Sequence, residues 1–239
     1  MATHGRRPAR RPVAKRSAAP PKKSGRAPRE KVVFDAPAPA PAPEEARTFR
    51  LGAVPGATPG KWIDAWKQRM PHVPLELVPL AVTDQARAVR DVDAALVRLP
   101  LDDPALHLIP LYDEVPVVVA PMDSHLHAAE ELSAADLVGE TLLPLADDAL
   151  PAHALPGTLA PRFGALSTQD AIATVASGVG IVVVPMSLAR LHRRKDVDQR
   201  PLRDGPISTV ALAWMRERTT PDVETFVGIV RGRTANSSR

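Results

Sequence analysis

The chain has 239 residues and a hydrophobic fraction of 44%, which is enough for one or two globular domains with a sizeable core. It has no cysteine, which excludes disulfide scaffolds, cysteine-based zinc sites and thiol nucleophiles, and no apolar run long enough to predict a membrane span. The net charge of +4 is unevenly spread: residues 1–34 carry eleven Lys or Arg and one Glu (+10), whereas residues 48–239 carry 19 basic and 23 acidic residues (−4).

Residues 1–47 are a Pro- and Ala-rich segment in which disorder is predicted. Apart from Met1, residues 1–31 hold a single large apolar residue, Val13, so burial cannot offset the entropy of ordering. The Ala-Pro repeat at 36–43 predicts a polyproline II spacer. No apolar region follows the arginine pairs at 6–7 and 10–11, so no secretory signal is predicted. We therefore expect a cytoplasmic protein.

The basic part of this segment favours non-specific contact with nucleic acid, with a steep salt dependence. The alternative is a solubilising extension. The residues assigned to the nucleic-acid contact are Arg6, Arg7, Arg10, Arg11, Lys15, Arg16, Lys22 and Lys23.

The folded part begins with alternating strand and helix patterns, which indicate parallel pairing through right-handed crossovers. Thr58 is the expected N-cap of the first helix, and Pro59 suits its first position. The expected elements are a strand at 48–54, a helix at 59–70, a strand at 73–79, a helix at 83–90 and a strand at 94–99.

The rest of the chain continues the α/β pattern, with a Pro- and Asp-rich loop at 144–161. Gly178 and Gly180 end a helix and lead into a β-branched strand. The expected strands are 108–111, 115–120, 141–143, 181–185 and 206–214, and the expected helices are 132–137, 167–177, 188–194 and 221–231.

Five segments follow one another in a recognisable order. They are the strand, turn and Trp-containing helix at the start, L-V-R-L-P-L-D-D-P-A-L at 96–106, L-Y-D-E-V-P-V-V-V-A-P at 111–121, S-A-A-D-L at 133–137, and V-A-S-G-V-G-I-V-V-V-P at 175–185. In this order they resemble the effector-sensing domain of LysR-type regulators. The resemblance extends over about 180 residues. Each piece alone is weak, but their shared order makes chance agreement improbable.

The resemblance implies an α/β fold of two Rossmann-like lobes with mainly parallel sheets, joined by two crossover strands as in type 2 periplasmic binding proteins. It places lobe one at about 48–116 and 212–233, lobe two at about 117–211, and a ligand cleft between them. Residues 234–239 are expected to be disordered. The family's winged helix-turn-helix has no counterpart in residues 1–47, because no apolar helical period precedes Phe49.

Two helix starts and one strand end supply the candidate effector-binding residues. Free N–H groups at Gly56, Ala57 and Thr58 favour a carboxylate, or Thr58 is simply an N-cap. The alternative roles of Arg98, which precedes Pro100, are pairing with a ligand carboxylate or with Asp102 or Asp103 at the surface. The list is completed by Ser167 and Thr168, at a helix start in lobe two, where plain capping is again the alternative.

Other motifs are better explained without catalysis or cofactors. Gly178-Val179-Gly180 follows a helix and opens a strand, which is the reverse of a dinucleotide fingerprint, and Pro55 rules out a P-loop. His125 and His127 are interpreted as part of a surface turn, and 192–195 as a solvated basic helix end that could contact phosphate. We expect no metal, no cofactor and no catalytic constellation.

The sequence therefore predicts a module that binds a small anionic effector and participates in transcriptional regulation without its own winged helix. A homodimer is expected from the resemblance, and no membrane contact. The alternative is a stand-alone solute-binding receptor with no DNA-linked output, and an enzyme on the same scaffold is disfavoured.

Overall fold

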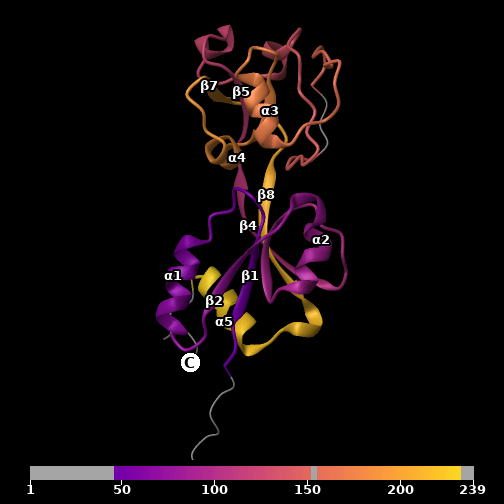
Figure 1. Ribbon diagram of the computed structural model, residues 1–239. Helices are drawn as coiled ribbons and strands as arrows, with labels where there is room; N and C mark the ends of the chain where they lie inside the picture. The colour runs from indigo at the N-terminus through magenta and orange to yellow at the C-terminus, as the bar shows by residue number, and fades with distance from the viewer. Residues whose placement is uncertain (1–45, 152–154, 233–239) are drawn as a thin grey trace, which may run out of the picture. The chain divides into compact units, whose positions relative to one another are not determined.

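The computed structural model describes residues 46–151 and 155–232, which contain two β-sheets with helices packed on them (Figure 1). The α/β class predicted from the sequence is confirmed. The predictions for residues 1–45 and 234–239 lie outside the described residues.

The first sheet has the strand order β2-β1-β3-β8-β4. Its strands are β1 (Phe49–Ala53), β2 (Leu75–Pro79), β3 (Ala94–Arg98), β4 (Leu106–Glu114) and β8 (Ser208–Met215). β1 pairs parallel with β2 and β3, as predicted, whereas β8 pairs antiparallel with β3 and β4. The ends of β1, β3 and β4 and the start of β8 therefore meet at one edge of the sheet.

Aromatic packing fixes one face of this sheet. Helices α1 (Gly60–Arg69) and α5 (Pro221–Val230) cover it, as Figure 1 shows. Trp66 of α1 is fully buried, and its ring centroid lies 4.5 Å from that of Phe49 and 5.9 Å from that of Phe226. The Trp66 indole N–H donates to the Val73 carbonyl at 2.8 Å, which satisfies the one polar atom of this side chain.

The opposite face is covered by residues 82–91, where a continuous helix was predicted. The segment is instead η1 (Val82–Asp84), α2 (Gln85–Ala88) and η2 (Val89–Asp91). The Gln85 amide turns inward, accepting from the Arg98 backbone N–H at 2.8 Å and donating to its carbonyl at 2.9 Å. This tertiary contact ties the segment to the end of β3.

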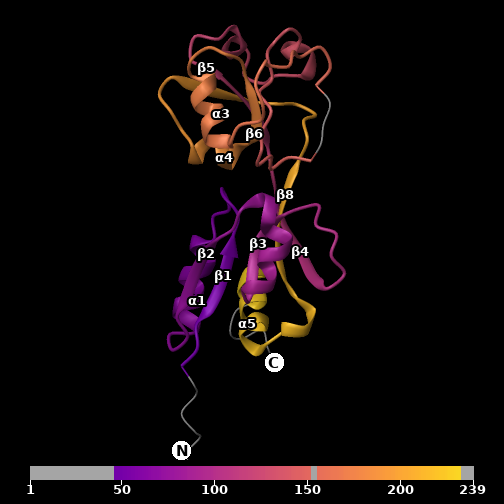
Figure 2. The same ribbon diagram turned by 45° about the vertical axis from the view of Figure 1, so that its right-hand side comes forward.

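The second sheet has the order β6-β5-β7, with both pairings antiparallel. Its strands are β5 (Pro116–Pro121), β6 (Val182–Pro185) and β7 (Val197–Pro201), and α3 (Thr168–Val175) and α4 (Met186–Leu191) pack on it (Figure 2). The expectation of mainly parallel sheets therefore holds only for β1, β2 and β3. Around the second sheet, parallel contacts occur as isolated bridges such as Leu142↔Ile181.

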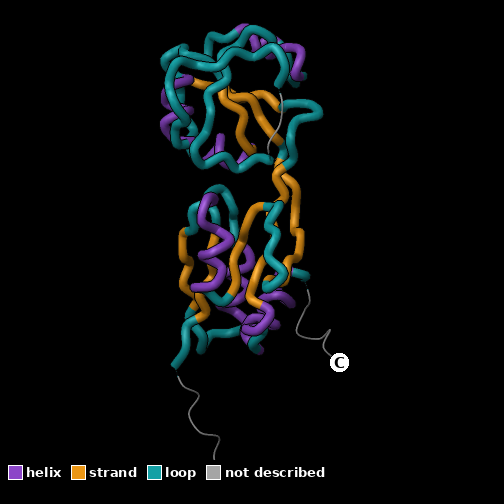
Figure 3. Tube along the Cα trace, turned by 90° about the vertical axis from the view of Figure 1, so that its right-hand side faces the viewer, coloured by secondary structure: helices purple, strands orange, loops and turns teal. Residues whose placement is uncertain are grey.

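Strand β7 was not predicted from the sequence. It pairs with β5, its sequence V-D-Q-R-P has no apolar alternation, and Val197 is its only buried residue. Much of residues 122–151 and 155–167 is drawn as loop in Figure 3, with the short 3-10 helices η3 (His125–Ala128) and η4 (Ala134–Leu137). The strand predicted at 141–143 makes only isolated bridges. In the described part of the chain, no helix is both long and apolar enough to cross a membrane.

The predicted turn between α3 and β6 depends on Gly180, which has a φ of +150°. A Cβ there would collide with the Thr141 carbonyl oxygen. We expect Gly180→Ala to lower the free energy of unfolding by about 1–3 kcal/mol, measured by urea denaturation. Gly228→Ala is the matched control, since a Cβ at this helical glycine meets nothing within 4 Å. A Gly180→Ala protein as stable as Gly228→Ala would contradict this role.

Candidate functional site

The candidate site is organised by Arg98, the last residue of β3, whose side chain is only 2% exposed. Its Nη1 atom pairs with the Glu114 carboxylate and donates to the Ser208 hydroxyl at 2.7 Å. Glu114 ends β4 and Ser208 begins β8, and the two residues are cross-strand partners. One guanidinium is therefore bonded to both strands through which the chain passes between the first sheet and the second.

The same guanidinium also contacts the start of α4, the helix that follows β6. Nη2 donates to the Pro55 carbonyl at 3.0 Å and to the Ser187 hydroxyl of α4 at 3.3 Å. Nε is buried and has no hydrogen-bond partner among the described residues. The sequence alternative of a surface pair with Asp102 or Asp103 is wrong, because Arg98 is buried and Asp103 pairs with Arg90.

Gly56 allows a close approach between the β1–α1 turn and α4. It has a φ of +84°, and an added Cβ would collide with the Ser187 hydroxyl and lie 3.1 Å from Arg98 Nη2. Ala57, the next residue, is half-buried and packs against the aromatic cluster of the first sheet. A side chain at position 56 would therefore disturb the positions of Ser187 and of the Arg98 guanidinium.

Thr58 does not cap α1, contrary to the sequence prediction. The helix starts at Gly60, with Pro59 in the cap position and no side-chain cap hydrogen bond. Thr58 instead lines a cavity together with Tyr112 of β4. Burial raises the pKa of the Tyr112 hydroxyl, the Glu114 charge raises it further, and the Thr58 hydrogen bonds act in the opposite direction.

Two cavities adjoin Arg98. One of about 440 Å³ is lined by Gly56 and Thr58 together with Tyr112, Glu114 and Ser187. The other, of about 340 Å³, is lined by Arg98 and Pro100 and by apolar residues of the segment 145–151. Sequence reasoning identified Gly56, Thr58, Arg98 and Pro100, but the structure distributes them over two cavities.

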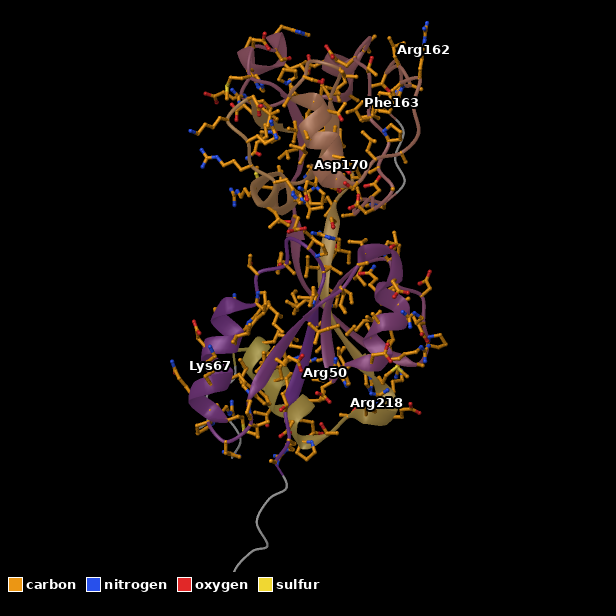
Figure 4. The ribbon with its side chains drawn as sticks, in the orientation of Figure 1. Arg50, Lys67, Arg162, Phe163, Asp170 and Arg218 are labelled. Atoms are coloured by element: carbon orange, nitrogen blue, oxygen red, sulfur yellow. The ribbon has the colours of Figure 1, made fainter. Side chains whose placement is uncertain are left out.

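Ser167 and Thr168 begin α3, as predicted, and both are engaged with the chain's own carboxylates. The Ser167 hydroxyl accepts from the Asp170 N–H at 3.1 Å, which confirms the cap (Asp170 is labelled in Figure 4). Thr168 is buried, and its N–H and hydroxyl both donate to Asp147 at 2.8 Å. Neither residue lines the two cavities around Arg98.

The contacts that sequence reasoning missed are Glu114, Ser187, Ser208, Tyr112 and Asp147. Nothing in their local sequence marks them, since each lies far along the chain from its partner. The histidine turn is η3, in which His127 Nε2 lies 2.8 Å from the Pro121 carbonyl, and the residues that the structure describes hold no cluster suited to a metal ion.

Two sheets with packed helices, and cavities at the edge where a buried arginine lies, define a periplasmic-binding-protein-like domain of the kind that senses small molecules. The chain belongs to the LysR substrate binding domain family, whose model matches residues 42–235.

Individual relatives agree with this membership. The chain is 26% identical over 209 residues to the Hca operon transcriptional activator HcaR of Escherichia coli (strain K12), covering 81% of this chain and 70% of that protein. It is 30% identical over 168 residues to the HTH-type transcriptional regulator CatR of Pseudomonas putida, covering 65% of this chain and 57% of that protein. The chain thus spans only part of both regulators.

The fold is also that of solved effector domains. The structure of the BenM effector binding domain with its effector benzoate has a TM-score of 0.63 and 22% sequence identity, covering 79% of this chain and 95% of that chain.

The buried Arg98–Glu114 pair gives a direct test of the site's architecture. Arg98→Met leaves the Glu114 carboxylate buried without its cation, so we expect a loss of about 3–5 kcal/mol in unfolding free energy, measured by urea denaturation. Arg98→Met combined with Glu114→Gln removes both charges and should recover part of that loss. If the loss in the double variant equals the sum of the losses in Arg98→Met and Glu114→Gln measured singly, the two side chains are not coupled.

Proposed function

We propose that the protein binds a small anionic effector at the edge of the first sheet, around Arg98, and that it takes part in transcriptional regulation. The observation that carries this proposal is the buried Arg98 guanidinium, which lines one cavity and is bonded to Glu114 and Ser187 in the lining of the other. Membership of the LysR substrate-binding family and the regulator names of HcaR and CatR support the regulatory role. The proposal assigns no catalytic role to any residue.

The proposed ligand has to compete with a carboxylate of the protein. Arg98 already holds Glu114, and a bidentate ligand carboxylate is the chemical group best suited to take its place. The unpartnered Nε of Arg98 offers one additional donor. In this proposal Gly56, Ala57, Thr58, Arg98 and Pro100 form the main contacts to the ligand.

Ser167 and Thr168 contribute to ligand binding only conditionally in this proposal. The start of α3 is occupied by Asp147, so a ligand reaches Thr168 only if the Asp147 carboxylate withdraws. Ligand binding would then draw α3 and the β1–α1 turn towards the same molecule and favour a closed arrangement of the two lobes. The proposal includes the lobe boundaries given above and a homodimer through which this closure is transmitted.

We further propose that the basic segment, rather than a winged helix, supplies the DNA contact of this chain. The support is the net charge of +10 over residues 1–34 and the lack of any apolar helical period before Phe49. Such contact is non-specific, because it is made with phosphates and reads no base edges.

A thermal-shift screen of the full chain against small carboxylates, benzoate and amino acids tests the ligand proposal. We expect a carboxylate to raise the melting temperature, since a ligand that binds only the folded state stabilises it. Thr58→Val should at least halve that shift. Thr225→Val, on α5, is the matched control and should leave it unchanged. A shift that survives both Thr58→Val and Thr168→Val would refute the site, and no hit among the anions would refute the ligand class.

The tail proposal is tested by fluorescence anisotropy with a labelled DNA duplex at increasing salt. The full chain should lose affinity steeply with salt, because binding releases counterions from the phosphates. Deleting residues 1–34 should abolish most of the affinity and flatten the salt slope. DNA binding that is unchanged by the deletion would contradict the proposal and leave the chain better described as a solute receptor.

A further inference from the structure

A third cavity lies away from Arg98, at the corner where α4 ends and β7 begins. Its volume is about 1010 Å³, at the upper end of the range typical of small-molecule pockets. Three apolar residues of its lining, Val119 of β5, Ala189 of α4 and Val197 of β7, belong to the core of the second sheet, and the exposed Met122 lies beside them. This part of the cavity offers an apolar contact surface and no polar partner.

Basic residues from the end of α4 and the following turn form most of the polar lining, beside Asp198 and Gln199 of β7. They are Arg190, Arg193, Arg194 and Lys195, and all four are exposed. Three of the four basic side chains of this cavity thus come from the motif His-Arg-Arg-Lys at 192–195, which has no part in the proposed effector site.

The acidic residues near the cavity are already paired. Asp196 accepts from Arg194 at 2.6 Å, and Asp198 accepts from Arg200 at 2.7 Å. Arg194 holds the pKa of Asp196 below its usual range by hydrogen bonding. Within 46–151 and 155–232, by contrast, Arg190, Arg193 and Lys195 form no ion pair with a carboxylate. Three positive charges therefore face the cavity without compensation.

We propose that this cavity is a second ligand site, which binds an organic dianion with a flat apolar body. The body lies against Val119, Ala189 and Val197, and the two acidic groups are held by the uncompensated cations. Inorganic phosphate or sulfate is disfavoured, because it leaves the apolar surface uncovered. Long-range attraction to the basic rim also speeds encounter with such a ligand.

Arg193 and Lys195 are the residues through which this site can be tested separately. Arg190 also lines the 440 Å³ cavity beside Gly56, so its replacement would affect both places. Arg193 and Lys195 line only the α4–β7 cavity among those described above, and both are exposed, so their replacement by Gln should leave the fold stable.

The experiment is isothermal titration calorimetry of the full chain with naphthalene-2,6-disulfonate at about 150 mM salt, where surface charges are screened beyond about 8 Å. Arg193→Gln/Lys195→Gln should weaken binding about tenfold or more. Lys67→Gln/Arg162→Gln removes the same charge from exposed residues of α1 and of a loop (both labelled in Figure 4) and should change affinity less than about twofold.

Four outcomes would overturn the proposal. The first is equal weakening by the two double variants, which would indicate general charge attraction. The second is loss of binding in Gly56→Ala, which would place the probe beside Arg98, and the third is displacement of the disulfonate by sulfate of equal affinity. The fourth is that the wild-type chain binds no probe and that Arg193→Gln/Lys195→Gln has a different oligomeric state from the wild type. The last would show that a second copy covers this face. The proposed effector site is tested separately, through Thr58→Val, so its failure can be told apart from the failure of this second site.

Discussion

Burial of the Arg98 guanidinium is the constraint on which the rest of the site depends. A buried cation is tolerated only when it is paired and hydrogen-bonded, and the available partners come from Glu114, Ser208, Pro55 and Ser187. These partners belong to the ends of β4 and β8, to the turn after β1, and to α4. Satisfying one side chain therefore ties the end of β4 and the start of β8 to α4, which packs on the second sheet. Gly56 is required at this point because any larger residue would displace Ser187.

The groups that a free anion would use are held by carboxylates of the chain itself. Glu114 occupies Arg98, and Asp147 occupies the N-terminus of α3. A helix N-terminus with its N–H groups satisfied in this way is already stabilised and offers a ligand little additional binding energy. The free energy that an incoming anion gains by pairing with the guanidinium must therefore exceed the free energy lost when Glu114 gives up its pairing with Arg98. This exchange favours ligands that add apolar contacts, such as those available along 145–151, over simple ions.

The sequence predicted those parts of the fold that depend on local periodicity. The Trp face of α1, the β-branched run of β6 and the amphipathic α5 all appear where the pattern placed them. The failures have tertiary causes. β7 has only one buried residue, and it pairs with β5 by backbone hydrogen bonds. The helix predicted at 83–90 is a succession of 3-10, α and 3-10 turns, with Gln85 bonded to the end of β3. The partners of Arg98 could not be inferred either, because they follow from the antiparallel register of β8 with β3 and β4.

Arg190 connects the two proposed ligand sites physically. It lines both the cavity beside Gly56 and the larger cavity at the α4–β7 corner, and α4 is only six residues long. A single guanidinium cannot pair fully with an anion in each cavity at the same time. Occupation of one site is therefore expected to weaken binding at the other, and by thermodynamic linkage the effect is equal in both directions. The same helix contributes Ser187 to the Arg98 network, so an anion that pulls on Arg190 also acts on the contact that holds α4 to the first sheet.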